Sequence, residues 1–130
     1  MTPQEILDIS YIGLMKQGDK STDRLGSCRY RGNKGMKCGV GFLLSDKAGK
    51  AFDKRYLSSA IHGVVDSKSK YVEEWMRNNI SLLCEIQAAH DTAQSYGFRD
   101  YITRQYHEIA TRHNLTLPNV DVTTGELIND

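Results

Sequence analysis

The sequence predicts an α+β fold, a mainly helical single domain with one β-hairpin near residues 28–42. Two observations carry this prediction. In several segments, apolar residues recur at helical spacing between a capping residue and a glycine. Between residues 28 and 42 the spacing changes, and apolar residues alternate with polar or small ones, as in strands with one buried face.

The length of 130 residues fits one domain. We expect residues 1–114 to form it, and residues 115–130, which contain Pro118 and little periodicity, to be an extended or mobile C-terminal tail. No apolar run approaches the ~20 residues that cross a bilayer, and the N-terminus lacks the features of a signal peptide. Three cysteines are too few for a disulfide framework. The sequence therefore predicts a cytoplasmic protein with reduced thiols and no membrane contact.

The first predicted helix covers residues 3–17. Thr2 can cap its N-terminus, and Glu5 stands three residues later, as in a capping box. Pro3 suits the first turn, where its missing N–H costs nothing. Gly18 is a natural stop for this helix.

Apolar periodicity predicts further helical segments along the rest of the chain. Ser81 can cap the clearest of them, residues 82–96, and Gly97 stops it. The last predicted helix covers residues 98–113 and buries Phe98, Ile102 and Ile109. The remaining segments are short and cover about residues 45–56, 57–64 and 71–79.

The predicted hairpin turns at Gly32-Asn33-Lys34-Gly35, which has turn composition. If Cys28, Tyr30 and Cys38 share the buried face, the numbers of paired residues must sum to an even value. We therefore expect an odd-length, bulged turn with Gly35 at positive φ. This register places three basic side chains together on the outer face: Arg29, Arg31 and Lys37.

The net charge of +1 is distributed unevenly. Residues 20–55 carry a net charge of +7, whereas residues 1–19 carry −2 and residues 56–130 carry −4. Such a split indicates either an acidic partner for the basic third or internal pairing between the regions. The candidate binding surface is the basic face of the hairpin, with Arg29, Arg31, Lys34 and Lys37.

Nucleic acid is one possible partner for this basic face, because a two-stranded ribbon can enter a groove with its cations on phosphates. Two observations weigh against it. The sequence pI of about 7.7 is low for a nucleic-acid binder, and Tyr30 cannot stack on a base if it points into the core. An acidic protein surface explains the same residues.

Four polar residues are candidates for a reactive site: Cys38, Gln87, His90 and Asp91. A thiol, an imidazole and a carboxylate are the groups from which a catalytic site with a cysteine nucleophile is built. Separately, His90-Asp91 is similar to the metal-binding dipeptide of phosphohydrolases. Burial of Cys38 would raise its pKa and lower its reactivity. A phosphohydrolase needs further His and Asp metal ligands at particular positions, and the other histidines of this sequence are not arranged convincingly for that. We therefore predict no catalytic residue.

Metal binding is not predicted either. Cys28 and Cys38 are separated by nine residues, whereas zinc ligand pairs usually have tighter spacing. Cys84 and His90 fall on one predicted helix but about 120° apart, so they do not form a chelating pair. We expect packed thiols, no metal and no cofactor.

Two stretches of the chain look familiar together: Cys28-Arg29-Tyr30-Arg31-Gly32 with its following Lys37-Cys38, and Gln87-Ala88-Ala89-His90-Asp91. Through these two stretches the chain resembles, over about residues 1–113, a family of small proteins encoded by bacteriophages and prophages. The family's Ile-Pro-Asp after the second strand reads Leu44-Ser45-Asp46 here. The resemblance implies a phage setting, and hence the host cytoplasm, but no particular activity.

Small size, the lack of an assembled catalytic set and the uneven charge favour a phage-type accessory protein. Such a protein binds and modulates a host enzyme or defence component, by inhibition, through a contact that is acidic on the partner. The alternative is a nucleic-acid-binding protein that uses the basic hairpin, and a weaker alternative is a small hydrolase with a His-Asp or Cys-based site. The oligomeric state stays open.

Overall fold

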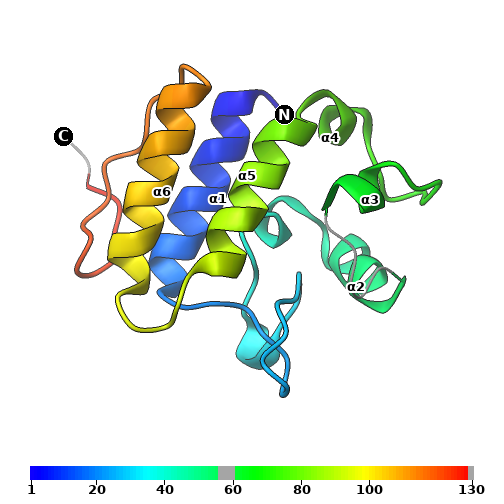
Figure 1. The fold of residues 1–130 in the computed structure, drawn as a ribbon, viewed down its shortest axis with the longest axis horizontal. Coiled ribbons are helices and arrows are strands. Elements are labelled where there is room, and N and C mark those ends of the chain that lie inside the picture. Colours follow the sequence, from blue (N-terminus) through cyan, green and yellow to red (C-terminus); the bar gives the residue numbers. More distant parts are fainter. Residues whose placement is uncertain (56–60, 129–130) are drawn as a thin grey trace.

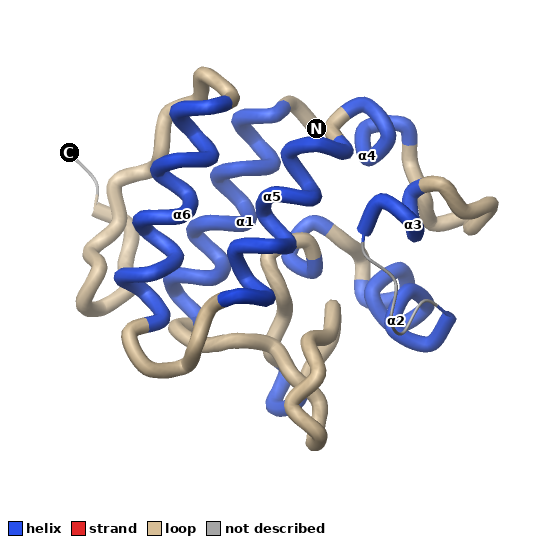
Figure 2. The backbone as a smooth tube through the Cα atoms, in the orientation of Figure 1, coloured by secondary structure: helices blue, strands red, loops and turns tan. Residues whose placement is uncertain are grey.

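The computed structural model describes residues 1–55 and 61–128. Across these residues the fold consists of six α-helices and two short 3₁₀-helices, and it has no β-strand (Figures 1 and 2). The predicted α+β class is therefore wrong, because the described chain is mainly helical without a sheet. The helices are α1 (Pro3–Gln17), α2 (Asp46–Arg55), α3 (Ile61–Val65), α4 (Glu74–Asn78), α5 (Ile80–Thr92) and α6 (Phe98–Arg112), with η1 (Asn33–Gly35) and η2 (Gly41–Leu43) between α1 and α2.

Three long helices form the body of the molecule. α6 packs against both α1 and α5, and the shorter α2, α3 and α4 lie on the far side of α5 (Figure 1). The buried faces of the long helices include Leu7, Leu14, Ile86 and Ile102, none of which is exposed to solvent. Burial of these apolar faces is the main force that holds the helices together.

Helix α1 begins and ends where the sequence predicts. The Thr2 hydroxyl accepts the Glu5 N–H, and the Glu5 carboxylate accepts the Thr2 N–H, which completes the capping box. Gly18 ends the helix in the left-handed conformation at φ 77°, and its N–H donates to the Leu14 carbonyl. Each of these residues bonds a group that is three or four residues away in the sequence, so the sequence alone was enough to predict both ends of the helix.

The other helices occupy the predicted regions with changed ends. α5 begins at Ile80, one residue before the predicted cap Ser81, and ends at Thr92 because Ala93 turns to extended backbone. Gly97, the predicted stop, lies at the start of α6 instead. α3 covers only the end of the predicted segment 57–64, of which residues 57–60 lie outside the described residues.

The predicted hairpin is replaced by a chain of turns between α1 and α2. The described residues contain isolated antiparallel bridges there, Thr22 with Cys28 and Arg31 with Lys37, and these do not extend into strands. Gly35 has the predicted positive φ, at 74°. The second predicted strand ends at Val40, whose helical backbone leads into η2.

Side chains from two helices take the backbone bonds that a partner strand would have used. The Tyr30 and Arg31 N–H groups donate to the two carboxylate oxygens of Asp53 in α2, at 2.9 and 2.8 Å. The Lys37 N–H donates to the Gln17 side-chain oxygen in α1, and the Gln17 amide donates to the Lys37 carbonyl. The segment is therefore attached to helices on both sides, and its backbone does not need a sheet.

The segment after α6, predicted as the tail, contains no helix among its described residues (up to 128) and lies against α1 and α6. The Gln4 amide donates to the Thr116 carbonyl at 2.7 Å, and the Thr116 N–H donates back to the Gln4 side chain. The Arg99 guanidinium joins the Met15 and Thr123 carbonyls. These bonds hold residues 115–123 on the helical body.

None of the helices in the described regions has the length and apolar character that a bilayer span requires.

Candidate functional site

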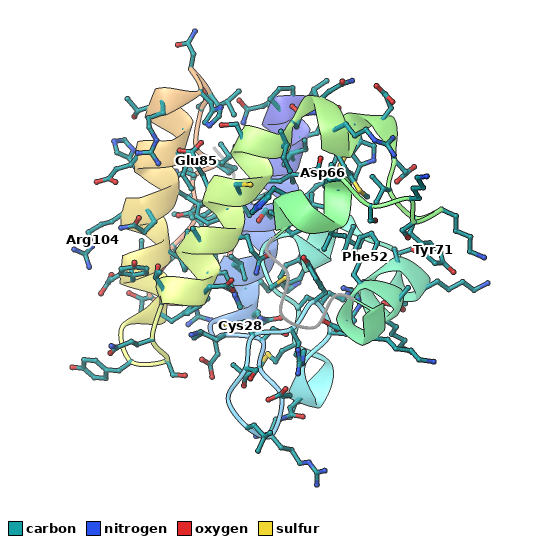
Figure 3. The ribbon with its side chains drawn as sticks, turned by 45° about the vertical axis from the view of Figure 1, so that its right-hand side comes forward. Cys28, Phe52, Asp66, Tyr71, Glu85 and Arg104 are labelled. Carbon is teal, nitrogen blue, oxygen red and sulfur yellow. The ribbon has the colours of Figure 1, made fainter. Side chains whose placement is uncertain are left out.

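The structure gathers all four polar residues chosen from the sequence into one network at the C-terminal half of α5. Gln87, His90 and Asp91 come from α5, and Cys38 comes from the chain of turns between α1 and α2 (residues 18–45), which we call the turn segment. The Cys38 thiol donates to the Gln87 side-chain oxygen, with 3.4 Å between the heavy atoms, and the Gln87 amide donates to Asp91 Oδ1 at 2.8 Å. Cys28 is a fifth member, and Figure 3 shows it near the lower end of α5. We call these five residues the α5 network.

His90 connects the network to the segment after α1. Its side chain is fully buried, and its Nε2 accepts the Ser21 N–H at 3.0 Å. A neutral imidazole has one lone pair, so Nδ1 carries the proton and donates it to Asp91 Oδ1 at 2.9 Å. The two partners therefore determine the tautomer of His90.

Asp91 is the acceptor on which the network converges. Besides the donors on His90 and Gln87, it takes a hydrogen bond from the Cys28 thiol. Burial alone would raise the pKa of Asp91, but the hydrogen bonds from His90 and Gln87 outweigh it and leave the pKa below its ordinary value. Lys20 adds a bond from its ammonium to the Asp91 carbonyl at 3.2 Å. Asp91 is therefore an ionised carboxylate that accepts hydrogen bonds from three side chains, while 41% of its side chain stays exposed to solvent.

Both thiols of the network are protonated near neutral pH. Burial, with a smaller contribution from the Asp91 charge, raises the pKa of Cys28 to about 11. Burial raises the pKa of Cys38 to about 12, although the Gly41 N–H donates to its sulfur at 3.2 Å. Because the thiolate is the nucleophilic form, neither cysteine is activated for catalysis.

The geometry also differs from that of a thiol–imidazole catalytic pair. In such a pair the free imidazole nitrogen accepts the thiol proton while the other nitrogen donates to a carboxylate. Here the accepting nitrogen of His90 is occupied by Ser21, and the Cys28 thiol is bonded to Asp91. The network ties the turn segment to α5, and it has no group in position to activate a nucleophile.

A metal site is the remaining chemical possibility for the network. Within the described residues, Cys28, His90 and Asp91 form the one group of three potential ligands, with ligand atoms all within 4.8 Å of one another. Thiol, imidazole and carboxylate suit zinc. The tautomer of His90 does not suit a metal. A metal on Nδ1 would move the imidazole proton to Nε2, and the Nε2–H would then point at the Ser21 N–H, so that two donors would face each other without an acceptor. We therefore derive no function from a metal at this position.

Two of the four residues predicted to form a basic binding face are held inside the molecule. Arg29 pairs with Asp23 at 2.6 Å. The Arg31 guanidinium donates to the Gly41 and Leu44 carbonyls, both at 2.8 Å, and its side chain is only 12% exposed. Arg31 therefore joins the turn segment to the start of α2, and little of its charged group is exposed to solvent.

The other two residues of that face lie nearer to solvent. Lys34 is exposed at the tip of η1, with φ 59°. Lys37 is partly exposed, and its ammonium lies 5.8 Å from the centre of the Phe42 ring. The sequence prediction therefore identified two surface cations and two internal ones.

Three exposed cations that the sequence analysis did not select lie together on α2. Lys47, Lys50 and Lys54 are exposed and follow one another at spacings of three and four residues, so they share one side of the helix. We call these three residues the lysine face. Helical spacing alone was a signal for this arrangement, whereas Ser21 and Asp53 gave no sequence signal for their contacts.

Comparison with known proteins adds no family to this description. No protein-family model, curated protein or solved structure matches the chain. The resemblance to phage-encoded proteins stays a prediction. Geometry alone therefore defines the class, a small helical protein with an internally hydrogen-bonded polar network and a cationic surface on α2.

Proposed function

We propose that the protein is a non-catalytic binding protein that attaches to an acidic surface of a host protein and modulates it. The observation that carries this proposal is the lysine face, with three exposed cations on one side of α2. A surface of one charge sign attracts a partner of the opposite sign and orients it during encounter. The bacteriophage resemblance supports a host protein as the partner, in the host cytoplasm.

The acidic residues of α2 do not cancel the lysine face. Asp53 accepts the Tyr30 and Arg31 N–H groups, as described above. Asp46 pairs with Arg31 at 3.0 Å, and this bond, together with the charges of Lys37 and Lys50, lowers its pKa. Three cations thus surround one carboxylate at the start of α2, and the local charge is positive.

A depression of mixed polarity next to α2 suits a protein partner. It has a volume of about 350 Å³, and its lining combines apolar side chains with polar ones: Leu44, Ala48, Tyr71 and Met76 with Ser45, Lys70 and Glu73. A protein interface usually combines an apolar contact with a polar rim. The lysine face and this depression provide both elements within one region.

The nucleic-acid alternative loses support from the internal use of the arginines. Arg29 and Arg31, which were to contact phosphates, make contacts within the chain, and Tyr30 is buried and cannot stack on a base. The hydrolase alternative loses support from the protonated thiols and the occupied His90. The nucleic-acid alternative is an outcome of the test below.

The test uses two variants with equal changes in net charge. K47E/K50E/K54E reverses the lysine face, whereas K68E/R77E/R104E reverses three exposed cations elsewhere; Figure 3 shows Arg104 on the opposite side of the molecule from α2. Wild-type protein and both variants are immobilised and exposed to nuclease-treated extract of a bacterial host. We expect one acidic protein to bind wild type and the control variant, and to be lost from K47E/K50E/K54E.

The affinity is then measured with the purified partner at increasing NaCl concentration. Reversal of the lysine face should raise Kd about 10- to 100-fold at low salt, with a smaller difference at high salt. Equal affinity of the two charge variants would contradict the proposal. Gel-shift binding of a 30-base-pair DNA or a 30-nucleotide RNA by wild type, without any protein partner, would favour the nucleic-acid alternative instead.

A further inference from the structure

The turn that connects Thr22 to Cys28 is ordered by its own hydrogen bonds. The Asp23 N–H donates to the Ser27 carbonyl at 2.9 Å, and the Gly26 N–H donates to the Asp23 carbonyl at 3.1 Å. The bridge between Thr22 and Cys28 closes its base. This loop is therefore a defined turn.

The Asp23 side chain adds three further bonds to the turn. Its Oδ1 accepts the Leu25 and Ser27 N–H groups, at 2.9 and 3.0 Å, and its Oδ2 pairs with Arg29. The backbone bond from Ser27 is the largest cause of the lowered pKa of Asp23. The carboxylate is thus ionised near neutral pH and fixes the backbone on both sides of Leu25.

Leu25 lies at the tip of this turn with 92% of its side chain surface exposed. An exposed leucine is ordinary by itself. Leu25 differs in that its backbone is fixed by Asp23 while its side chain contacts almost nothing. Because the backbone of this turn is fixed before binding, insertion of Leu25 into a pocket costs less backbone conformational entropy.

Cationic side chains flank Leu25. Arg24 is exposed next to it and forms no ion pair with any described residue. Lys34 is exposed on η1, and that turn is joined to the Leu25 turn by the bond from the Asn33 N–H to the Thr22 carbonyl, at 2.8 Å. Figure 1 shows both turns projecting together from the lower end of the molecule. The apolar tip therefore lies among cations.

We propose that the Leu25 turn is an anchor that inserts into an apolar pocket with an acidic rim on the partner protein. Leu25 would fill the pocket, and Arg24 and Lys34 would contact the rim. Charge complementarity selects this occupant, because a wholly apolar partner would leave both cations without counter-charges. The inference rests on the proposed function, since it assigns a contact of that binding protein.

Photo-crosslinking tests which molecule surrounds position 25. The crosslinker p-benzoylphenylalanine replaces Leu25 in one full-length protein and Tyr96, which is 96% exposed on the α5–α6 connection, in a control protein. After irradiation in bacterial host cells, we expect position 25 to label one protein segment that contains apolar residues with neighbouring Asp or Glu. Labelling of nucleic acid, of a second copy of this chain, of nothing, or of the same products from both positions would overturn the proposal.

The labelled segment is then synthesised as a peptide and its Kd is measured by calorimetry. L25S should weaken binding about 30-fold, which corresponds to removal of one buried leucine side chain. L25M, which keeps the apolar volume, should change Kd less than threefold. Y96S is the matched control and should bind as wild type, and an equal loss from L25S and Y96S would overturn the assignment to the Leu25 turn.

The two proposals fail in different ways. Loss of binding in L25S should persist at high salt, whereas loss in K47E/K50E/K54E should diminish as salt rises. If L25S weakens binding while the lysine variant does not, the Leu25 anchor stands and the lysine face is wrong. If only the lysine variant weakens binding, the anchor is wrong and the proposed function stands.

Discussion

The Ser21 backbone N–H donates to His90 Nε2 at 3.0 Å, so a fully buried imidazole acts as an acceptor for a residue far away in the sequence. Ser21 also bonds through its hydroxyl to the Met36 carbonyl. One residue of α5 thereby holds the start of the turn segment, and through Ser21 it holds the far side of that segment as well.

His90→Ala should lower the free energy of unfolding by about 2–4 kcal/mol, because it leaves a cavity and removes the acceptor of a buried N–H. Urea denaturation followed by circular dichroism measures this change. The control is His107→Ala, an exposed residue of α6, which should cost less than about 0.5 kcal/mol. Equal stability of the two variants would show that the bond between Ser21 and His90 contributes little.

Asp91 should contribute stability that is lost in acid. Its folded pKa lies below the ordinary value of 3.8, so the folded state favours the carboxylate. The contribution is complete above about pH 4 and declines as the pH falls through the folded pKa. Unfolding free energies of wild type and Asp91→Asn, measured from pH 2.5 to 7, should therefore converge at low pH. A difference that is constant over this range would contradict the lowered pKa.

Cys28 should react slowly with iodoacetamide. Its pKa of about 11, against an ordinary 9.0, reduces the thiolate near neutral pH about 100-fold. Asp91→Asn removes a neighbouring negative charge and should increase the rate. Peptide mass spectrometry gives the rate for Cys28 alone, and the urea-unfolded protein provides the reference for a free thiol. A folded Cys28 that reacts as fast as the unfolded reference would refute the raised pKa of this partly buried thiol.

Arg31→Lys should lower the free energy of unfolding by about 2 kcal/mol although it keeps the charge. A lysine ammonium cannot reach the Gly41 and Leu44 carbonyls together with Asp46, as the guanidinium does. Lys34→Ala, at the exposed tip of η1, should change stability by less than about 0.5 kcal/mol. Thermal and urea unfolding measure the stability of both variants. An Arg31→Lys protein as stable as wild type would mean that Arg31 acts through its charge alone.

The sequence was sufficient where the signals are local. Thr2, Glu5 and Gly18 act on the backbone within a few residues, and α1 was predicted at its observed ends. The ends of α5 were not predicted, because the helix starts before Ser81 and stops at Thr92, where the backbone of Ala93 is extended.

The hairpin prediction failed for a long-range reason. Tyr30 and Cys38 are buried as predicted, but Cys28 is only partly buried and residues 38–41 are all buried in succession, so burial does not alternate along the segment. The alternation in the sequence describes only side chains. It contains no information about where the backbone N–H groups donate. Asp53 and Gln17, from helices on either side, accept the bonds that would otherwise have formed a ladder.

The candidate site shows the same division. Cys38, Gln87, His90 and Asp91 were chosen for their chemistry, and they do lie together. The addition of Cys28 and the occupied His90 nitrogen depend on contacts between segments far apart in sequence. Those contacts show that the four candidates, for which no catalytic role was predicted, belong to one hydrogen-bonded network between α5 and the turn segment.

The hydroxyls of Ser10 and Tyr106 meet at 2.6 Å inside the body, so the first helix is buried against the last. During synthesis, α1 leaves the ribosome long before its packing partner has been translated. Its apolar side cannot be buried by that helix until residues 98–112 have been translated, so this part of the core forms only after α6 has left the ribosome.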